Sequence, residues 1–95
     1  MVVGVLRLEL FLPAPQSLKE KRSIVRKVLG RCRERWPVSA AETGLHDLWQ
    51  RAELGFVMVG RAEDPIRNTF AQIEEEIESL GVAQINEEAL EFLHY

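Results

Sequence analysis

Residues Ser17 to Arg35 read SLKEKRSIVRKVLGRCRER, and this stretch predicts one long amphipathic helix. Ser17 is a favourable N-cap, and Glu20 follows three residues later, so a capping box can close the first turn. Pro37 predicts that the helix ends at about Trp36. One side of the helix is apolar, because its residues recur at helical spacing. These residues are Leu18, Ile24, Val25, Val28, Leu29, Cys32 and Trp36.

The rest of this helix is strongly basic. Eight Lys and Arg residues stand between Ser17 and Arg35, against two acidic residues. At about 100° per residue, Lys19, Arg22, Arg26 and Arg33 fall within an arc of roughly 60°. A solvated helix face usually mixes charges, since opposite charges four residues apart stabilise a helix. Arg22 and Arg26 instead form a like-charge pair at this spacing.

The basic residues also begin in the first turns, where the helix dipole favours carboxylates. A bound phosphate would offset this mismatch, because free N–H groups, the dipole and cationic side chains all attract it. We therefore predict an anion or nucleic-acid site. Its residues are Lys19, Lys21, Arg22, Arg26 and Arg33. Two other interpretations stay open: a solubilising face balanced by the acidic half of the chain, and a contact surface for a protein partner.

Length and composition indicate a single domain over residues 1–95 with one modest core. The one cysteine, Cys32, allows no intrachain disulfide, lies on the apolar side of the helix and is expected in the core. No apolar run approaches the roughly 18–20 residues of a membrane-spanning helix. The N-terminus enters a strand pattern without a signal peptide, so a reducing, cytoplasmic location is expected.

Charge is unevenly distributed along the chain. The net charge of −3 argues against strong nonspecific nucleic-acid binding, yet Glu63 to Tyr95 holds nine acids and one base. A mildly acidic protein with one basic edge still fits local binding of a polyanion. Nine arginines against three lysines fit a thermophile, although GC-rich codon usage gives the same bias.

The remaining pattern predicts an α+β, ferredoxin-like βαββαβ fold. Strands are expected at Val2 to Leu12, Val38 to about Leu45 and Ala52 to Val59, with a last strand after Val82. A second helix is expected from Asp64 as N-cap to Gly81 as C′ residue. Two split βαβ units then give a four-stranded antiparallel sheet with both helices on one face.

This arrangement leaves one sheet face open. The apolar residues expected to line it are Val3, Val5, Phe11, Val57 and Val59. A monomer tends to cover such an area, so a homodimer through this face or along a sheet edge is predicted. The alternative is that long side chains such as Arg7 and Glu9 shield it.

No catalytic, metal-binding or cofactor-binding constellation is found. His46 and Asp47 are adjacent and point in different directions, which suits them poorly to acid–base chemistry. The acidic cluster at Glu74 to Glu78 is expected to be a solvated helix face. Phosphate-binding glycine motifs and the aromatic motif of RNA-recognition domains are absent. An enzyme acting on a phosphorylated ligand would lack a general base, so no enzymatic activity is expected.

Two segments resemble the bacterial YlxP-like family, a small family of unknown function, and the similarity runs over essentially the whole chain. They are Ser17-Leu18-Lys19-x-Lys21-Arg22 and Asp47-x-Trp49-Gln50-x-Ala52-x-Leu54-Gly55. The chain departs from the family's usual valine after Glu42. The resemblance implies a cytosolic ferredoxin-like domain whose genes often lie near those of translation factors, and hence association with RNA or the ribosome.

The resemblance also implies a second patch between the two middle strands. Its residues are Asp47, Trp49, Gln50 and Arg51. The alternative is structural, with Trp49 packed against the sheet edge, Asp47 capping the turn and Gln50 bonded to backbone.

Overall fold

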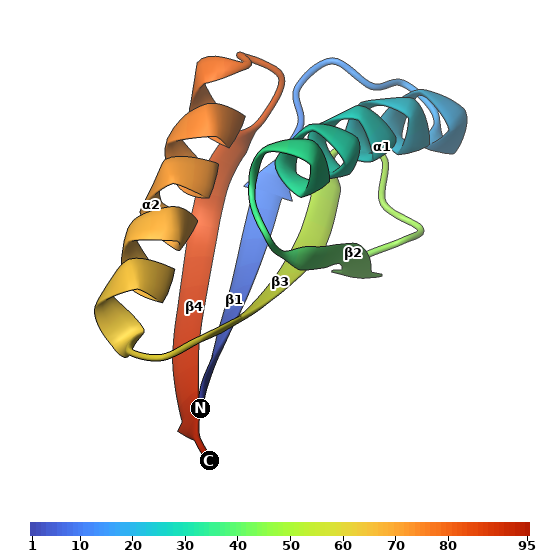
Figure 1. The fold of residues 1–95 in the computed structure, drawn as a ribbon. Helices are drawn as coiled ribbons and strands as arrows, with labels where there is room; N and C mark the ends of the chain where they lie inside the picture. Colours follow the sequence, from blue (N-terminus) through green and yellow to red (C-terminus); the bar gives the residue numbers. More distant parts are fainter.

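The computed structural model describes residues 1–95 and contains four strands and two helices in the order βαββαβ (Figure 1). The strands are β1 (Val2–Phe11), β2 (Ser39–Gly44), β3 (Arg51–Gly60) and β4 (Gln84–His94). The helices are α1 (Leu18–Arg35) and α2 (Glu63–Ser79). The last segment is therefore a strand, as its place at the end of the pattern predicts.

The strands form one antiparallel sheet in the order β2-β3-β1-β4. β1 and β3 pair along their whole length, with Val2 opposite Gly60 and Phe11 opposite Arg51. Both helices lie on the same face of the sheet (Figure 1). This arrangement confirms the predicted ferredoxin-like fold, and it makes the short strand β2 one edge of the sheet.

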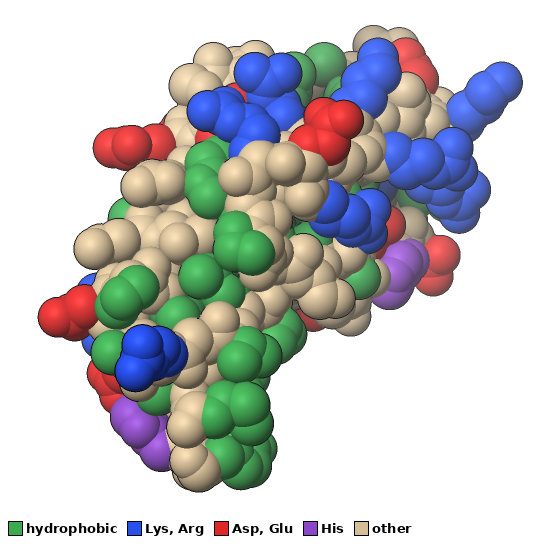
Figure 2. Space-filling model, in the orientation of Figure 1, with side chains coloured by type: hydrophobic (Ala, Val, Ile, Leu, Met, Phe, Trp, Pro, Cys, Tyr) green, Lys and Arg blue, Asp and Glu red, His purple; other side chains and the backbone are tan.

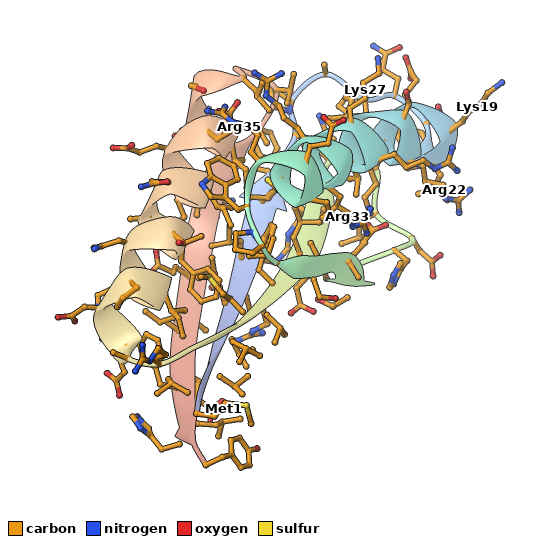
Figure 3. All side chains as sticks on the ribbon, in the orientation of Figure 1. Met1, Lys19, Arg22, Lys27, Arg33 and Arg35 are labelled. Atoms are coloured by element: carbon orange, nitrogen blue, oxygen red, sulfur yellow. The ribbon has the colours of Figure 1, made fainter.

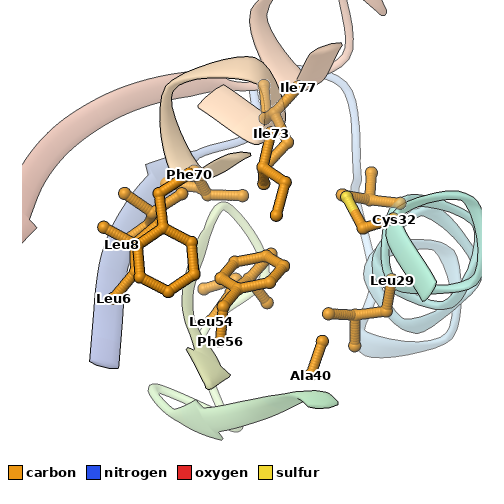
Figure 4. Close-up of a cluster of buried hydrophobic side chains, with 14 of the residues drawn as sticks. Leu6, Leu8, Leu29, Cys32, Ala40, Leu54, Phe56, Phe70, Ile73 and Ile77 are labelled. Carbon is orange, nitrogen blue, oxygen red and sulfur yellow. The ribbon is translucent and has the colours of Figure 1, made fainter. Parts of the chain in front are cut away.

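The core lies between the sheet and the two helices (Figure 4). Leu6, Leu8 and Leu10 of β1 and Leu12 just after it are almost fully buried, as the period of two predicts. The buried residues of α2, Ile66, Phe70, Ile73 and Ile77, recur at three- and four-residue spacing and so lie on one side of the helix. Burial of each such side chain stabilises the fold by about 1.5–3 kcal/mol relative to exposure.

The two helices begin differently. The side chain of Ser17 accepts a hydrogen bond from the Glu20 amide at 3.1 Å, which confirms the N-cap of α1. For α2 the prediction of Asp64 as N-cap is wrong, because the helix begins at Glu63 and Ala62 is the N-cap residue without a side-chain bond. The acidic groups of Glu63 and Asp64 then both lie in the first turn, where the helix dipole favours them.

The ends of the chain and of α2 complete the fold. Gly81 follows α2 with a φ of +72°, the left-handed conformation that favours glycine at this position. Met1 and Tyr95 lie side by side and exchange backbone hydrogen bonds at 3.0 and 2.8 Å (Figure 1). Neither helix is long and apolar enough to cross a membrane.

The open sheet face is apolar at the end that carries the termini (Figure 2). Val57 and Val59 of β3 are 39% and 58% exposed, as expected for this face. At the other end, Arg7 pairs with Glu53 at 3.0 Å and Arg51 pairs with Glu9. Ion pairs therefore shield only part of the face, and the valines stay in contact with solvent.

Candidate nucleic-acid interface

The basic residues of α1 follow one flank of the helix, which we call the basic stripe (Lys19, Arg22, Arg26 and Arg33). All four side chains are exposed, while Val25, Leu29 and Cys32 of the same helix are buried against the sheet. Figure 2 shows Lys and Arg side chains gathered over α1, and Figure 3 shows Lys19 and Arg22 pointing away from the protein. The apolar periodicity of α1 thus fixes where the cations point.

The stripe differs from the other cations of α1 in its partners. Arg31 and Arg35 both pair with Glu76 of α2. Lys19, Arg22 and Arg26 take part in no ion pair, although the chain has more acidic than basic residues. Glu76 therefore offsets part of the charge of Arg31 and Arg35, whereas no carboxylate pairs with Lys19, Arg22 or Arg26.

Arg33 stands at the margin of the stripe. Its guanidinium donates a hydrogen bond to the backbone oxygen of Ala40 in the edge strand β2. This bond ties the end of α1 to the sheet edge and holds Arg33 in place. Arg33 is accordingly less free than Lys19, Arg22 and Arg26 to reach an anion.

The prediction that Lys21 belongs to the anion site is wrong. Lys21 is completely buried, and its ammonium nitrogen lies 2.8 Å from a carboxylate oxygen of Glu42. It also donates a hydrogen bond to the backbone oxygen of Leu45 at 2.7 Å. A lysine is almost never fully buried unless it is paired, and these partners leave Lys21 no access to an external phosphate.

The start of α1 supplies its own negative charge. Glu20 accepts hydrogen bonds from the Gln16 amide at 2.8 Å and from the Ser17 hydroxyl at 3.3 Å. A carboxylate at this place interacts favourably with the helix dipole. An anion-binding role therefore depends on the exposed side chains of the stripe rather than on the free amides of the helix end.

The second predicted patch lies in the β2–β3 loop (residues 45–50) and the first residue of β3. Trp49 is 53% exposed, so about half of its surface is open to solvent. Leu48 beside it, which the sequence did not single out, is 40% exposed. An exposed indole next to an exposed leucine offers a flat apolar surface to a partner.

The other members of this patch have different roles. Gln50 donates a side-chain hydrogen bond to the Pro13 oxygen at 2.9 Å, as the structural alternative expected, and Arg51 pairs with Glu9. Asp47 is exposed and forms no ion pair. Only Trp49 and Asp47 of the four predicted residues are thus free to meet a ligand.

Lys21 also connects the two predicted patches. Its ammonium group holds the backbone oxygens of Leu45 and His46, at 2.7 and 3.5 Å, beneath α1. The β2–β3 loop is therefore fixed to the helix that carries the basic stripe. One buried side chain positions the loop of Trp49 relative to Arg22 and Arg26.

Two titratable groups have pKa values far from their usual range. Burial raises the pKa of the Cys32 thiol to about 11, with a further contribution from Glu76. Burial also raises the pKa of Glu74 to about 8, and its hydrogen bond with Glu88 of β4 acts in the same direction. The acidic side of α2 is thus only partly solvated, which corrects the expectation from sequence.

Outside the two predicted patches, few side chains that could act in catalysis or metal binding lie close together. His94 lies 2.6 Å from a carboxylate oxygen of Glu63, a contact between β4 and α2 that the sequence did not indicate. No group of three or more His, Cys, Asp or Glu side chains is arranged to hold a metal ion.

Two comparisons with known proteins bear on this chain. A family model described as "Protein of unknown function (DUF503)" matches residues 3–89. The Bacillus subtilis (strain 168) protein named "Uncharacterized protein YlxP" is 34% identical over 58 residues, which are 61% of this chain and 63% of that protein. The match therefore spans less than two thirds of that relative. Neither description names a ligand, a partner or a reaction.

Proposed function

Because the chain belongs to the DUF503 family of proteins of unknown function, we propose from its surface that it binds RNA, in the ribosome or another rRNA-containing assembly. The proposal describes a binding module, not an enzyme. Lys19, Arg22 and Arg26 contact phosphates, and Arg33 contributes at the margin. The observation that carries it is that these three cations are exposed, aligned and without any ion-pair partner.

Unpaired like charges on one helix flank repel one another, and a bound phosphate backbone would reduce this repulsion. Lys19 and Arg26 are seven residues apart, so the three cations extend over about 10 Å along the helix axis. Arginine favours phosphate because its planar guanidinium donates two parallel hydrogen bonds. A stripe of this length suits successive phosphates of one strand better than a single small anion.

Trp49 adds a contact of another kind. RNA-binding proteins stack unpaired bases on exposed aromatic side chains. The exposed indole lies in the loop that Lys21 fixes to α1, so a strand bound along the stripe has an aromatic platform on a neighbouring element. This pairing favours single-stranded or looped RNA over a regular duplex.

The acidic half of the protein favours one orientation of the protein relative to RNA. Glu63 to Tyr95 contains nine acids and one base and forms α2 and β4. These elements lie on the opposite side of the molecule from Lys19 and Arg22 (Figure 3). RNA would be repelled from α2 and β4, which leaves the flank of α1 as the surface that faces it.

Fluorescence anisotropy with a labelled rRNA fragment tests the proposal. The variant Arg22→Glu/Arg26→Glu removes two stripe cations, and Lys27→Glu/Arg61→Glu makes the same charge change at exposed, unpaired residues elsewhere. We expect the first variant to lose affinity by at least about tenfold, since contacts to charged groups are worth about 1.5–3 kcal/mol each, and the second to lose much less. Equal losses in both variants would contradict a site at the stripe.

A second candidate function is a homodimeric interaction module, which the open sheet face favours. Val57 and Val59 of β3 and Leu93 of β4 are exposed on the two strands that flank β1, and Met1 and Tyr95 extend the same apolar end. Sedimentation equilibrium would show a particle of twice the 10.9 kDa chain mass, and Val59→Asp would reduce it to the monomer. A monomeric mass at all micromolar concentrations would rule this function out.

A further inference from the structure

A groove runs between α1 and the turn that follows α2, and Arg33 is the only residue of the basic stripe that lines it. Ile24 and Val28 of α1 and Leu80 and Val82 beyond α2 form its apolar part, and its volume is about 770 Å³. Figure 1 shows α1 and this turn at the same end of the molecule. Lys19, Arg22 and Arg26, the three cations proposed to contact phosphates, do not line the groove.

Gly30 lines this groove and has no role within the chain itself. A Cβ atom at Gly30 would have no neighbour within 4 Å, and its φ is not in the left-handed region. A glycine inside a helix is less favourable than alanine, because its backbone loses more freedom on folding. The missing side chain leaves room for another backbone to approach α1 closely.

The charges at the groove complement an acidic partner. Lys27, Arg31 and Arg33 line it against a single acid, Glu34. Lys27 forms no ion pair, whereas Arg31 is shared with Glu76. An apolar floor is unsuited to a phosphate backbone but suited to a helix whose apolar side chains enter the groove and whose carboxylates meet its rim.

We propose that this groove binds an amphipathic, acidic helix of a partner protein, with its backbone seated over Gly30. The inference does not rest on the proposed RNA binding, because Lys19, Arg22 and Arg26 do not line the groove. Residues that anchor the partner helix contact Ile24, Val28, Leu80 and Val82, and its carboxylates contact Lys27.

A displayed library of random peptides tests the proposal on the full chain. Peptides of about 16 residues, roughly four helical turns, are selected on the protein and then depleted on the Gly30→Leu variant. We expect the peptides that remain to carry apolar residues at three- and four-residue spacing together with Asp and Glu. Loss of all peptides in the depletion step, or enrichment of basic or unpatterned ones, would overturn the proposal.

One selected peptide, made synthetically, then measures the role of Gly30. Gly30→Leu should weaken its binding by at least about tenfold, the cost of a poorly accommodated contact of about 1.4 kcal/mol. Gly30→Ala should weaken it less while raising the Tm by a few degrees, since alanine favours the helix. Asn68→Leu, an exposed position of α2, is the control and should leave affinity unchanged. A Gly30→Leu variant that binds as well as the wild type would contradict the proposal.

The other occupants of the groove give different results. Methyl NMR shifts on peptide binding should fall on Val28, Leu80 and Val82, and shifts confined to Val57 and Val59 would move the site to the open sheet face. Self-association that Gly30→Leu abolishes would make the occupant a second copy of the chain. RNA affinity should be unchanged in Gly30→Leu, and its loss would assign the groove to the RNA surface instead.

Discussion

The ammonium nitrogen of Lys21 lies 2.8 Å from Oε2 of Glu42, inside the protein, and joins α1 to the edge strand β2. Oε2 of Glu42 accepts no hydrogen bond within the protein, and its contact with Lys21 is an ion pair. Lys21 directs its best hydrogen bond to the Leu45 oxygen. The lysine is thus a structural anchor for the β2–β3 loop.

Replacing Lys21 should therefore lower the free energy of unfolding of the protein. Lys21→Met leaves the mostly buried Glu42 without its partner, which costs about 3–5 kcal/mol. Urea unfolding measures this loss. The double variant Lys21→Met/Glu42→Leu should recover most of it, because apolar pairs replace buried ion pairs well. A stable Lys21→Met protein with weaker RNA binding would instead mean that Lys21 is part of the RNA-binding surface.

The two tryptophans should respond differently to truncation. Trp49→Ala removes an exposed stacking surface and should lower RNA affinity by about tenfold, since stacking is worth about 1–3 kcal/mol per base. Its Tm should be nearly unchanged. Trp36 packs against the core and donates a hydrogen bond to Gln72 at 2.9 Å. Trp36→Ala should cost about 2 kcal/mol of stability. Anisotropy and thermal melts separate the two effects, and unchanged RNA affinity in Trp49→Ala would remove the stacking contact.

The raised pKa of Glu74 predicts a pH-dependent stability. The unfolded chain releases this proton near pH 4.5, and the folded protein holds it to about pH 8. The contribution of protonated Glu74 to the stability of the fold is therefore complete below pH 4.5, and it is lost as the pH rises through about 8. The like charges of Glu88 and Glu78 work in the same direction.

Glu74→Gln, which stays neutral at every pH, is the matched comparison. The wild type should match this variant near about pH 4.5 and fall below it near about pH 8. Solvent screening at this partly exposed site limits the difference to about 1 kcal/mol, or roughly 4–8 °C in Tm. Parallel Tm curves for the two proteins across this range would show that Glu74 titrates normally.

Cys32 should be inert in the native protein. Burial raises the pKa of its thiol to about 11, so almost no thiolate forms near neutral pH. A thiol reagent such as DTNB should label Cys32 slowly in the folded state and rapidly in urea. Fast labelling of the native protein would mean that α1 opens away from the sheet.

Periodicity predicted most of the fold because it reports local burial. The apolar spacing along α2 and the alternation along β1 both match the residues that are buried in the structure. The start of α2 was misplaced because Asp64 and Pro65 suit several positions of a first turn, and the contact of Glu63 with His94 is not visible in sequence. The helical spacing did indicate that Lys21 is buried, because it lies four and seven residues before Val25 and Val28, on the buried side of α1.

The candidate sites were less accessible to sequence reasoning. Residue type alone cannot tell Arg22, which is unpaired, from Arg31, which meets Glu76 across the two helices. The exposure of Trp49 depends on how the β2–β3 loop is held by Lys21. The groove beside Gly30 combines residues from α1 and from the turn after α2, so it exists only in the folded chain.

The most direct test of RNA binding at the stripe is the salt dependence of the affinity. Each phosphate contact releases counterions, so the slope of log K against log[salt] is about −0.7 per contact for a single strand. We predict a slope near −2 for the wild type and a slope shallower by about 0.7 for Arg22→Ala. Absence of binding at low salt, or a slope that Arg22→Ala leaves unchanged, would contradict the account.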